Sequence, residues 1–179
     1  MTLAKYNKII SILVVIFIVI FIIYKYFEQG YKFGDKIGTF NGVDVYSNQL
    51  GKTNSLDSNY YNGIYTGQKW QCVEFARRYL IIKEGITFSD VDSAFEIPQA
   101  QFKTLDGVLV KMSNDLKPGS LIVWSNGYEK GLTDGHVAIV SLVTPFGVTV
   151  VEQNYIDSWF HRFIKISELK NVTIIGIPK

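Results

Sequence analysis

The strongest hydrophobic pattern along the chain is an unbroken apolar run from Ile9 to Ile23, which reads IISILVVIFIVIFII. With the aromatic residues that follow, up to Phe27, the run covers about 19 residues and is interrupted only by Lys25. At 1.5 Å per residue, a helix of that length is about 28 Å long, close to the hydrocarbon core of a bilayer at about 30 Å. The pattern therefore predicts a single-pass transmembrane helix over residues 9–27, which contacts the lipid bilayer and places the protein at a membrane.

Two other interpretations of this run stay open. A cleaved signal peptide requires a small-x-small cleavage site, whereas the run is followed by YKYFEQGYKFG, which contains none. A buried core helix requires a core large enough to cover an apolar helix on all sides. Lysines flank the run in similar number on both sides, so the charges do not give its orientation in a membrane.

A helical period predicts a second helix from about Cys72 to Lys83. Val73, Ala76 and Leu80 fall on one stripe of this helix, and further apolar side chains lie beside them, so most of its circumference is apolar. We expect such a helix to be buried on several sides and to end at the next glycine.

Polar and turn-forming residues lie on both sides of this helix. Residues 29–66 are rich in Gly, Asn, Ser and Tyr, which predicts a loop-rich lead-in with one hairpin. After the helix, a shorter one is expected to begin beyond Ser89 or Asp90 and to be limited or kinked by Pro98.

Strand patterns dominate the rest of the chain. Apolar runs separated by turn residues predict strands over 120–124, 136–143, 148–154 and 172–177. The sequence TPFG between the second and third runs suits a hairpin turn. Helices followed by an antiparallel sheet predict an α+β fold. We therefore expect two parts, an N-terminal anchor at 1–28 and a globular domain at 29–179.

Composition and charge exclude several classes of protein. A chain of 179 residues that is 47% hydrophobic is neither disordered nor a disulfide scaffold, and its single cysteine cannot form an intrachain disulfide. The net charge of +2 lies in residues 1–28, and the balanced remainder argues against a nucleic-acid partner. Two histidines and one cysteine form no zinc-binding pattern, and neither a metal nor another cofactor is expected.

The single cysteine, Cys72, lies where a loop leads into the predicted helix. The free N–H groups and the positive dipole end of a helix N-terminus stabilise a thiolate, and they also stabilise the oxyanion that forms when a thiolate attacks a carbonyl. The alternative is that Cys72 is a small apolar core residue. Position alone does not decide between nucleophile and core residue.

A thiolate needs a base, and the chain has two histidines, His136 and His161. His136 opens a predicted strand after a turn glycine and is the candidate base, whereas His161 is expected to be a surface or packing residue. The group that orients the base is expected to be Glu152 or Asn154 on the partner strand. With a three-residue hairpin loop, however, Val140 would face Glu152, which leaves Glu152 four residues from His136 along the ladder.

Three motifs together resemble one family. YTGQKWQCVEFARRYL, DGHVAIV and VVEQN resemble the CHAP amidase family, a branch of the papain-like cysteine hydrolases. Within it, the chain is most similar to the amidase domains of bifunctional glutathionylspermidine synthetase/amidase and trypanothione synthetase, over roughly residues 33–177. The resemblance implies a papain-like fold with helices packed on an antiparallel sheet. It also implies a triad of Cys72 as nucleophile, His136 as base and Glu152 as the orienting carboxylate.

Three more residues are site candidates. Gln71, just before the nucleophile, is an oxyanion donor or a solvent-facing amide. Asn154 could hold the substrate or the histidine ring. Arg77 could meet a substrate carboxylate, although a structural salt bridge is the stronger interpretation.

The sequence therefore predicts a membrane-anchored cysteine amidase that hydrolyses an amide bond through a thioester. The first expected substrate is a glutathionylspermidine-type conjugate, and no ATP-driven ligation is expected. A peptide of peptidoglycan is the alternative substrate. A different alternative is an inactive fold that only binds its ligand, against which the complete set of Cys, His and Glu argues.

Overall fold

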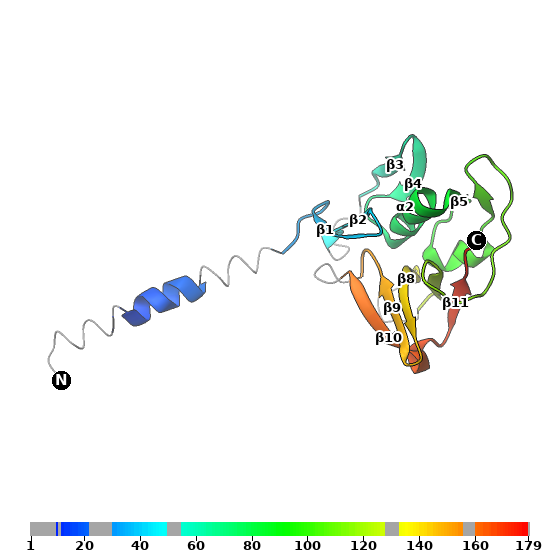
Figure 1. Cartoon of the computed structure of the whole chain (residues 1–179). Coiled ribbons are helices and arrows are strands. Elements are labelled where there is room, and N and C mark those ends of the chain that lie inside the picture. The colour runs from blue at the N-terminus through cyan, green and yellow to red at the C-terminus, as the bar shows by residue number, and fades with distance from the viewer. Residues whose placement is uncertain are drawn as a thin grey trace. The chain divides into compact units, whose positions relative to one another are not determined.

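A computed structural model describes residues 10, 12–21, 30–49, 55–127, 133–155 and 160–178. The chain divides into two compact units, Met1–Gly30 and Tyr31–Lys179, and each is considered by itself (Figure 1). All candidate site residues belong to the second unit.

The described part of the first unit is helical at residue 10 and over residues 12–21. Among the residues that the structure describes, no helix is long and apolar enough to cross a membrane. The predicted transmembrane helix over residues 9–27, its contact with the lipid bilayer and the membrane location are therefore wrong. Residues 9, 11 and 22–27 of that prediction lie outside the described residues.

Two β-hairpins open the second unit. β1 (Lys36–Phe40) pairs with β2 (Val43–Tyr46), and β3 (Ser58–Tyr61) pairs with β4 (Ile64–Gln68), both antiparallel. Each turn is an Asn-Gly pair with positive φ at both residues, which is the backbone that tight hairpins favour. The lead-in thus holds two hairpins where its composition predicts one, and the Asn-Gly pairs are their sequence signal.

The helix α2 (Cys72–Glu84) begins at the predicted residue and is buried on most of its circumference. It ends at Gly85, which adopts the left-handed conformation with φ of 64°. β5 (Ile86–Phe88) then pairs with β6 (Phe102–Thr104), and the 3-10 helix η2 (Ala94–Gln99) lies between them in sequence. The shorter helix predicted before Pro98 is therefore only this 3-10 helix, with Pro98 inside it.

The C-terminal half forms one antiparallel sheet in the order β10-β9-β8-β7-β11 (Figure 1). The strands of this sheet are β7 (Leu121–Trp124), β8 (His136–Thr144), β9 (Gly147–Val151), β10 (His161–Lys165) and β11 (Val172–Ile175). The 3-10 helix η3 (Ile166–Glu168) lies between β10 and β11 in sequence. The hydrophobic pattern predicts all of these strands except β10, a short edge strand with polar residues. The structure is a mixed α+β fold with antiparallel sheets, so the predicted fold is corrected in two ways: hairpins precede the helix, and the described residues contain no transmembrane helix.

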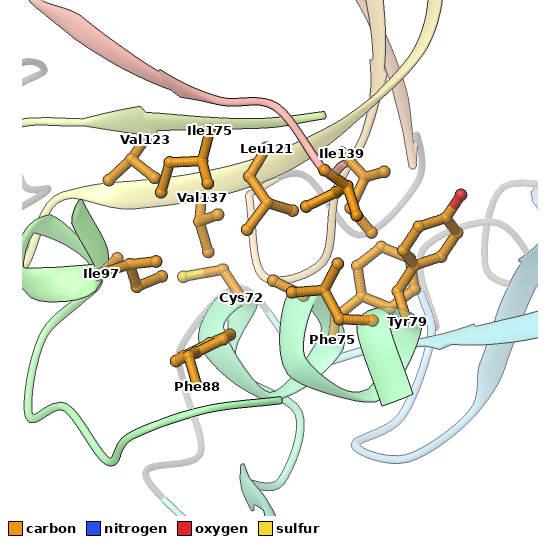
Figure 2. Close-up of a cluster of buried hydrophobic side chains, with 14 of the residues drawn as sticks. Cys72, Phe75, Tyr79, Phe88, Ile97, Leu121, Val123, Val137, Ile139 and Ile175 are labelled. Atoms are coloured by element: carbon orange, nitrogen blue, oxygen red, sulfur yellow. The ribbon is translucent and has the colours of Figure 1, made fainter. Parts of the chain in front are cut away.

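Apolar side chains cover both faces of this sheet. Figure 2 shows one face, where Leu121, Val137 and Ile139 pack against Phe75 and Tyr79 of α2. The other face carries a smaller cluster, which contains Ile122, Trp124, Ala138, Val140, Val148, Val150 and Ile164. Burial on both faces explains why these strands appear in the sequence as continuous apolar runs. The packing on both faces also holds in place the strand ends at which the candidate site residues lie.

Candidate active site

His136 and Glu152 come from neighbouring strands and meet inside the protein. His136 is the first residue of β8 and follows Gly135, whose φ is 67°. Glu152 directly follows the last residue of β9. The Nε2 of His136 lies 3.0 Å from Oε2 of Glu152, and the two side chains are 2% and 1% exposed. The ring therefore has the carboxylate partner that orients a catalytic base.

The register of the β8–β9 hairpin explains this contact. Its loop holds two residues, where the predicted hairpin has three, and a bulge lies between Val140 and Leu142. Val140 consequently faces Val150 and not Glu152. The expected register is therefore wrong by two residues, and Glu152 is close enough to His136 for a diagonal side-chain contact.

Cys72 is the first residue of α2, and its side chain lies between this helix and the sheet (Figure 2). Burial alone would raise the pKa of this thiol, but the charge of His136 and a hydrogen bond with its ring outweigh burial and lower the pKa of Cys72. Hydrogen bonds from the backbone N–H groups of Val137 and Val73 lower it further. A lowered pKa beside an imidazole is typical of a nucleophilic cysteine.

The imidazole of His136 is biased toward its charged form. Burial would lower the pKa of His136, but the charge of Cys72, a hydrogen bond with it and then the carboxylate of Glu152 raise that pKa to about 9. The rings of Trp124 and Tyr155 lie with centroids 5.7 Å and 5.4 Å from the imidazole. Because Nε2 faces Glu152, Nδ1 is the nitrogen left for the thiol. Cys72 and His136 can therefore exist as a thiolate–imidazolium pair near neutral pH.

Glu152 has a second partner, Arg162 of β10, for which the sequence gives no signal. The Nε of Arg162 lies 2.8 Å from Oε1 of Glu152, and its Nη2 lies 3.0 Å from Oε2 of the same carboxylate. Burial would raise the pKa of Glu152, but hydrogen bonding and charge from His136, followed by Arg162, hold that pKa below its ordinary value. The carboxylate is therefore ionised and bound on both oxygens.

Gln71 and Asn154 are brought together beside Cys72. The Nδ2 of Asn154 donates a hydrogen bond of 2.6 Å to Oε1 of Gln71. Both residues line the cleft that contains Cys72 and His136, and the bond occupies the Oε1 of Gln71 and not its Nε2. Asn154 thus contacts the candidate oxyanion donor, while the carboxylate beside the histidine ring belongs to Glu152.

Arg77 lines the same cleft but is tied into the fold. It is 2% exposed, and it donates hydrogen bonds to the backbone oxygens of Thr66 and Ser89. Its guanidinium also pairs with the carboxylate of Asp90 at 3.1 Å and lies 4.5 Å from the ring centroid of Phe88. These contacts are the structural salt bridge that the sequence analysis favours for this residue.

A cleft of about 560 Å³ runs past Cys72 and His136. Among the described residues, its lining includes Asp92, Asp134 and the ion pair of Asp90 with Arg77, so acidic side chains outnumber arginines there. A larger cavity of about 970 Å³, lined from residues 98–114 and 173–175, contains none of the candidate residues. Within the described ranges, no three His, Cys, Asp or Glu side chains gather to hold a metal ion.

Gln153 is a further residue that reasoning from motifs misses. It is 1% exposed, and its Nε2 donates to the backbone oxygen of Gln71 at 3.1 Å and to Oε2 of Glu74 at 3.0 Å. Its Oε1 accepts a hydrogen bond of 2.8 Å from the backbone N–H of Tyr46. Gln153 thereby joins the segment after Glu152 to the N-terminus of α2. Its only sequence signal is its place within the VVEQN motif.

Sequence similarity to known proteins extends over most of this chain. It is 35% identical over 133 residues to the bifunctional glutathionylspermidine synthetase/amidase of Escherichia coli (strain K12), which covers 65% of this chain and 21% of that protein. It is 29% identical over 141 residues to the trypanothione synthetase of Crithidia fasciculata, covering 73% of this chain and 21% of that protein. The chain thus spans about a fifth of the length of these relatives.

A solved structure is also similar. The N-acetylmuramoyl-L-alanine amidase from Staphylococcus aureus matches with a TM-score of 0.49 and 17% identity, over 67% of this chain and 34% of that one. Residues 60–154 match the family model of the CHAP domain. The predicted resemblance is confirmed, including the homology to the amidase domains of glutathionylspermidine synthetase/amidase and trypanothione synthetase. The chain belongs to the CHAP domain family.

Proposed function

We propose that the chain is a cysteine amidohydrolase with Cys72 as nucleophile, His136 as acid and base, and Glu152 as the orienting carboxylate. The contact of these three side chains carries the proposal: the thiol at the start of α2 interacts with a ring whose Nε2 lies 3.0 Å from Glu152. Homology to amidase domains supports hydrolysis of an amide bond as the reaction.

In the first step, the thiolate of Cys72 attacks the carbonyl carbon of the amide and forms a C–S bond. Backbone N–H groups at the start of α2 and the Nε2 of Gln71 stabilise the oxyanion that develops. The imidazolium of His136 gives its proton to the amide nitrogen, the C–N bond breaks and the amine leaves. The acyl group stays on the sulfur as a thioester.

In the second step, water hydrolyses the thioester. The neutral ring of His136 takes a proton from water, and the resulting hydroxide adds to the thioester carbonyl. The C–S bond then breaks, which releases the carboxylic acid and restores the thiolate–imidazolium pair. Glu152 keeps the ring in one orientation through both steps because its hydrogen bond to Nε2 leaves Nδ1 directed at the reacting groups.

The proposed substrate is an amide whose amine part is positively charged, such as a glutathionylspermidine-type conjugate. The carboxylates of Asp92 and Asp134 line the cleft beside the Arg77–Asp90 ion pair, and a polyamine has the complementary charge. The Escherichia coli relative is a glutathionylspermidine synthetase/amidase, which supports the same substrate class.

The proposal is tested by incubating the full chain with glutathionylspermidine and measuring released spermidine by mass spectrometry. We expect release by the parent chain and by a control, His161→Gln, and a loss of at least about 10³-fold with Cys72→Ala. A peptidoglycan stem peptide is assayed in parallel. Cleavage of the stem peptide alone contradicts the polyamine substrate, and binding without cleavage of either compound contradicts the enzymatic function.

A further inference from the structure

β10 brings Arg162 against the carboxylate of Glu152. Two hydrogen bonds join them, from Nε to Oε1 at 2.8 Å and from the terminal guanidinium nitrogen to Oε2 at 3.0 Å. The same Oε2 lies 3.0 Å from Nε2 of His136. One carboxylate therefore binds two basic side chains, and one of its oxygens is shared between them.

Arg162 is held firmly in this position. Its guanidinium carbon lies 3.9 Å from the ring centroid of Tyr155 and 5.1 Å from that of Trp124, and the same two rings flank the imidazole of His136. The side chain of Arg162 is 22% exposed, while that of Glu152 is 1% exposed. A two-point contact of this kind fixes the plane of a carboxylate, which a lysine, with its single ammonium, does not do.

We propose that Arg162 is a positioning residue of this site, which fixes the plane of the Glu152 carboxylate and takes a share of its negative charge away from His136. The inference rests on the proposed function, in which His136 both gives and takes a proton. A carboxylate that bound His136 alone would hold the imidazolium more strongly, and the ring would then give its proton to the leaving amine less readily.

Other groups around His136 and Glu152 also affect the titration of these two residues. Among the described residues, the charged and titratable groups that contact His136 or Glu152 are Cys72 from α2, Arg162 from β10 and Tyr155 from the loop after β9. β7 contributes the neutral ring of Trp124. Asp134, two residues before His136, hydrogen-bonds with Ser93 instead. Arg162 is therefore the cation whose removal changes the charge at Glu152 most directly.

The test follows the titration of His136 by NMR in the full chain, in a His161→Gln background that leaves one histidine signal. With Arg162→Gln we expect the midpoint of His136 to rise by roughly one pH unit, because the carboxylate charge then acts on the ring alone. Arg162→Lys keeps the charge and is expected to stay within about 0.3 pH unit of the parent. Glu152→Gln is expected to lower the midpoint. Lys165→Gln removes a charge from an exposed position of the same strand and is the matched control.

An unchanged midpoint in Arg162→Gln, or a fall like that of Glu152→Gln, overturns the proposal, since a packing role alone would not raise the midpoint. Should Arg162→Gln fail to fold, the Nε–H signal of Arg162 in the parent chain decides: it is expected to titrate with the midpoint of His136, and independent titration overturns the proposal. None of these measurements uses an amide substrate. A lack of amidase activity would therefore count against the proposed function and not against this inference.

Discussion

Among single residues, Cys72 shows how burial and charge oppose each other at one atom. Its side chain packs in the same apolar cluster as Phe75 and Ile97, and an apolar environment disfavours a thiolate. The charge of His136 and the hydrogen bond with its ring are what lower the pKa of this thiol in spite of burial. Without the imidazole, burial would raise the pKa of this thiol against the opposing effect of the backbone hydrogen bonds from Val137 and Val73.

We therefore predict that His136→Ala moves the pH midpoint for alkylation of Cys72 upward by roughly one pH unit or more. In the parent chain the pKa of Cys72 lies below its ordinary value of 9.0, so labelling is expected to continue at pH values where a free thiol is protonated. The measurement is the rate of iodoacetamide labelling against pH by mass spectrometry, which is unambiguous because the chain has one cysteine. His161→Ala is the control, and the same midpoint in both variants would return Cys72 to the role of a core residue.

Among the structural elements, the start of β8 determines where the candidate base lies. Gly135 precedes His136 with φ of 67°, and a Cβ at this position would lie 2.5 Å from the backbone oxygen of Trp124. That oxygen belongs to the neighbouring strand β7 and cannot move independently of the sheet. A side chain at residue 135 would therefore displace the first residue of β8.

We predict that Gly135→Ala lowers the free energy of unfolding by about 2–3 kcal/mol and reduces amide hydrolysis at least about tenfold, because the turn is strained and His136 moves. The matched control is Gly127→Ala, since Gly127 also has positive φ (71°) but a Cβ there would meet none of the described residues within 4 Å. That control is expected to lose about 1 kcal/mol or less and to keep its activity. Urea denaturation and initial rates measure both effects, and equal losses in the two variants would disprove the steric argument.

The same elements show what can be predicted from the sequence. The apolar runs identify β7, β8, β9 and β11, and the Cys72 helix start follows from its periodicity. The register of β8 with β9 depends on the loop length and on the bulge between Val140 and Leu142, neither of which has a reliable sequence signal. For that reason the contact of His136 with Glu152 could be named only from family resemblance. Arg162 could not be found, because a lone arginine on a polar edge strand resembles any surface residue.

In the second unit as a whole, Gln153 connects the segments that carry the site. Its side chain binds the backbone of β2, the residue before Cys72 and the buried carboxylate of Glu74. Glu74 in turn accepts hydrogen bonds from Asn59 and Arg78. A polar network therefore joins a hairpin, the helix and the sheet.

We predict that Gln153→Leu lowers the free energy of unfolding by about 2–4 kcal/mol, because it leaves part-buried backbone groups of Tyr46 and Gln71 and the buried carboxylate of Glu74 without this partner. Thermal and urea unfolding of the full chain measure the loss. Gln101→Leu, at an exposed position, is the control and is expected to change stability by about 0.5 kcal/mol or less. A loss as small as that of the control would show that water replaces the side chain of Gln153 in these contacts.

The network around Gln153 also limits how a descendant of this protein could become inactive while it remains folded. Glu152, Gln153 and Arg162 are bound to several segments at once, so drift at these positions would lower the abundance of the protein together with its chemistry. Cys72 differs, since replacement of a sulfur by a hydroxyl or a methyl group at a helix start is a small change in volume. Inactive members that retain the fold are therefore expected to have lost the nucleophile first and to keep the residues around it.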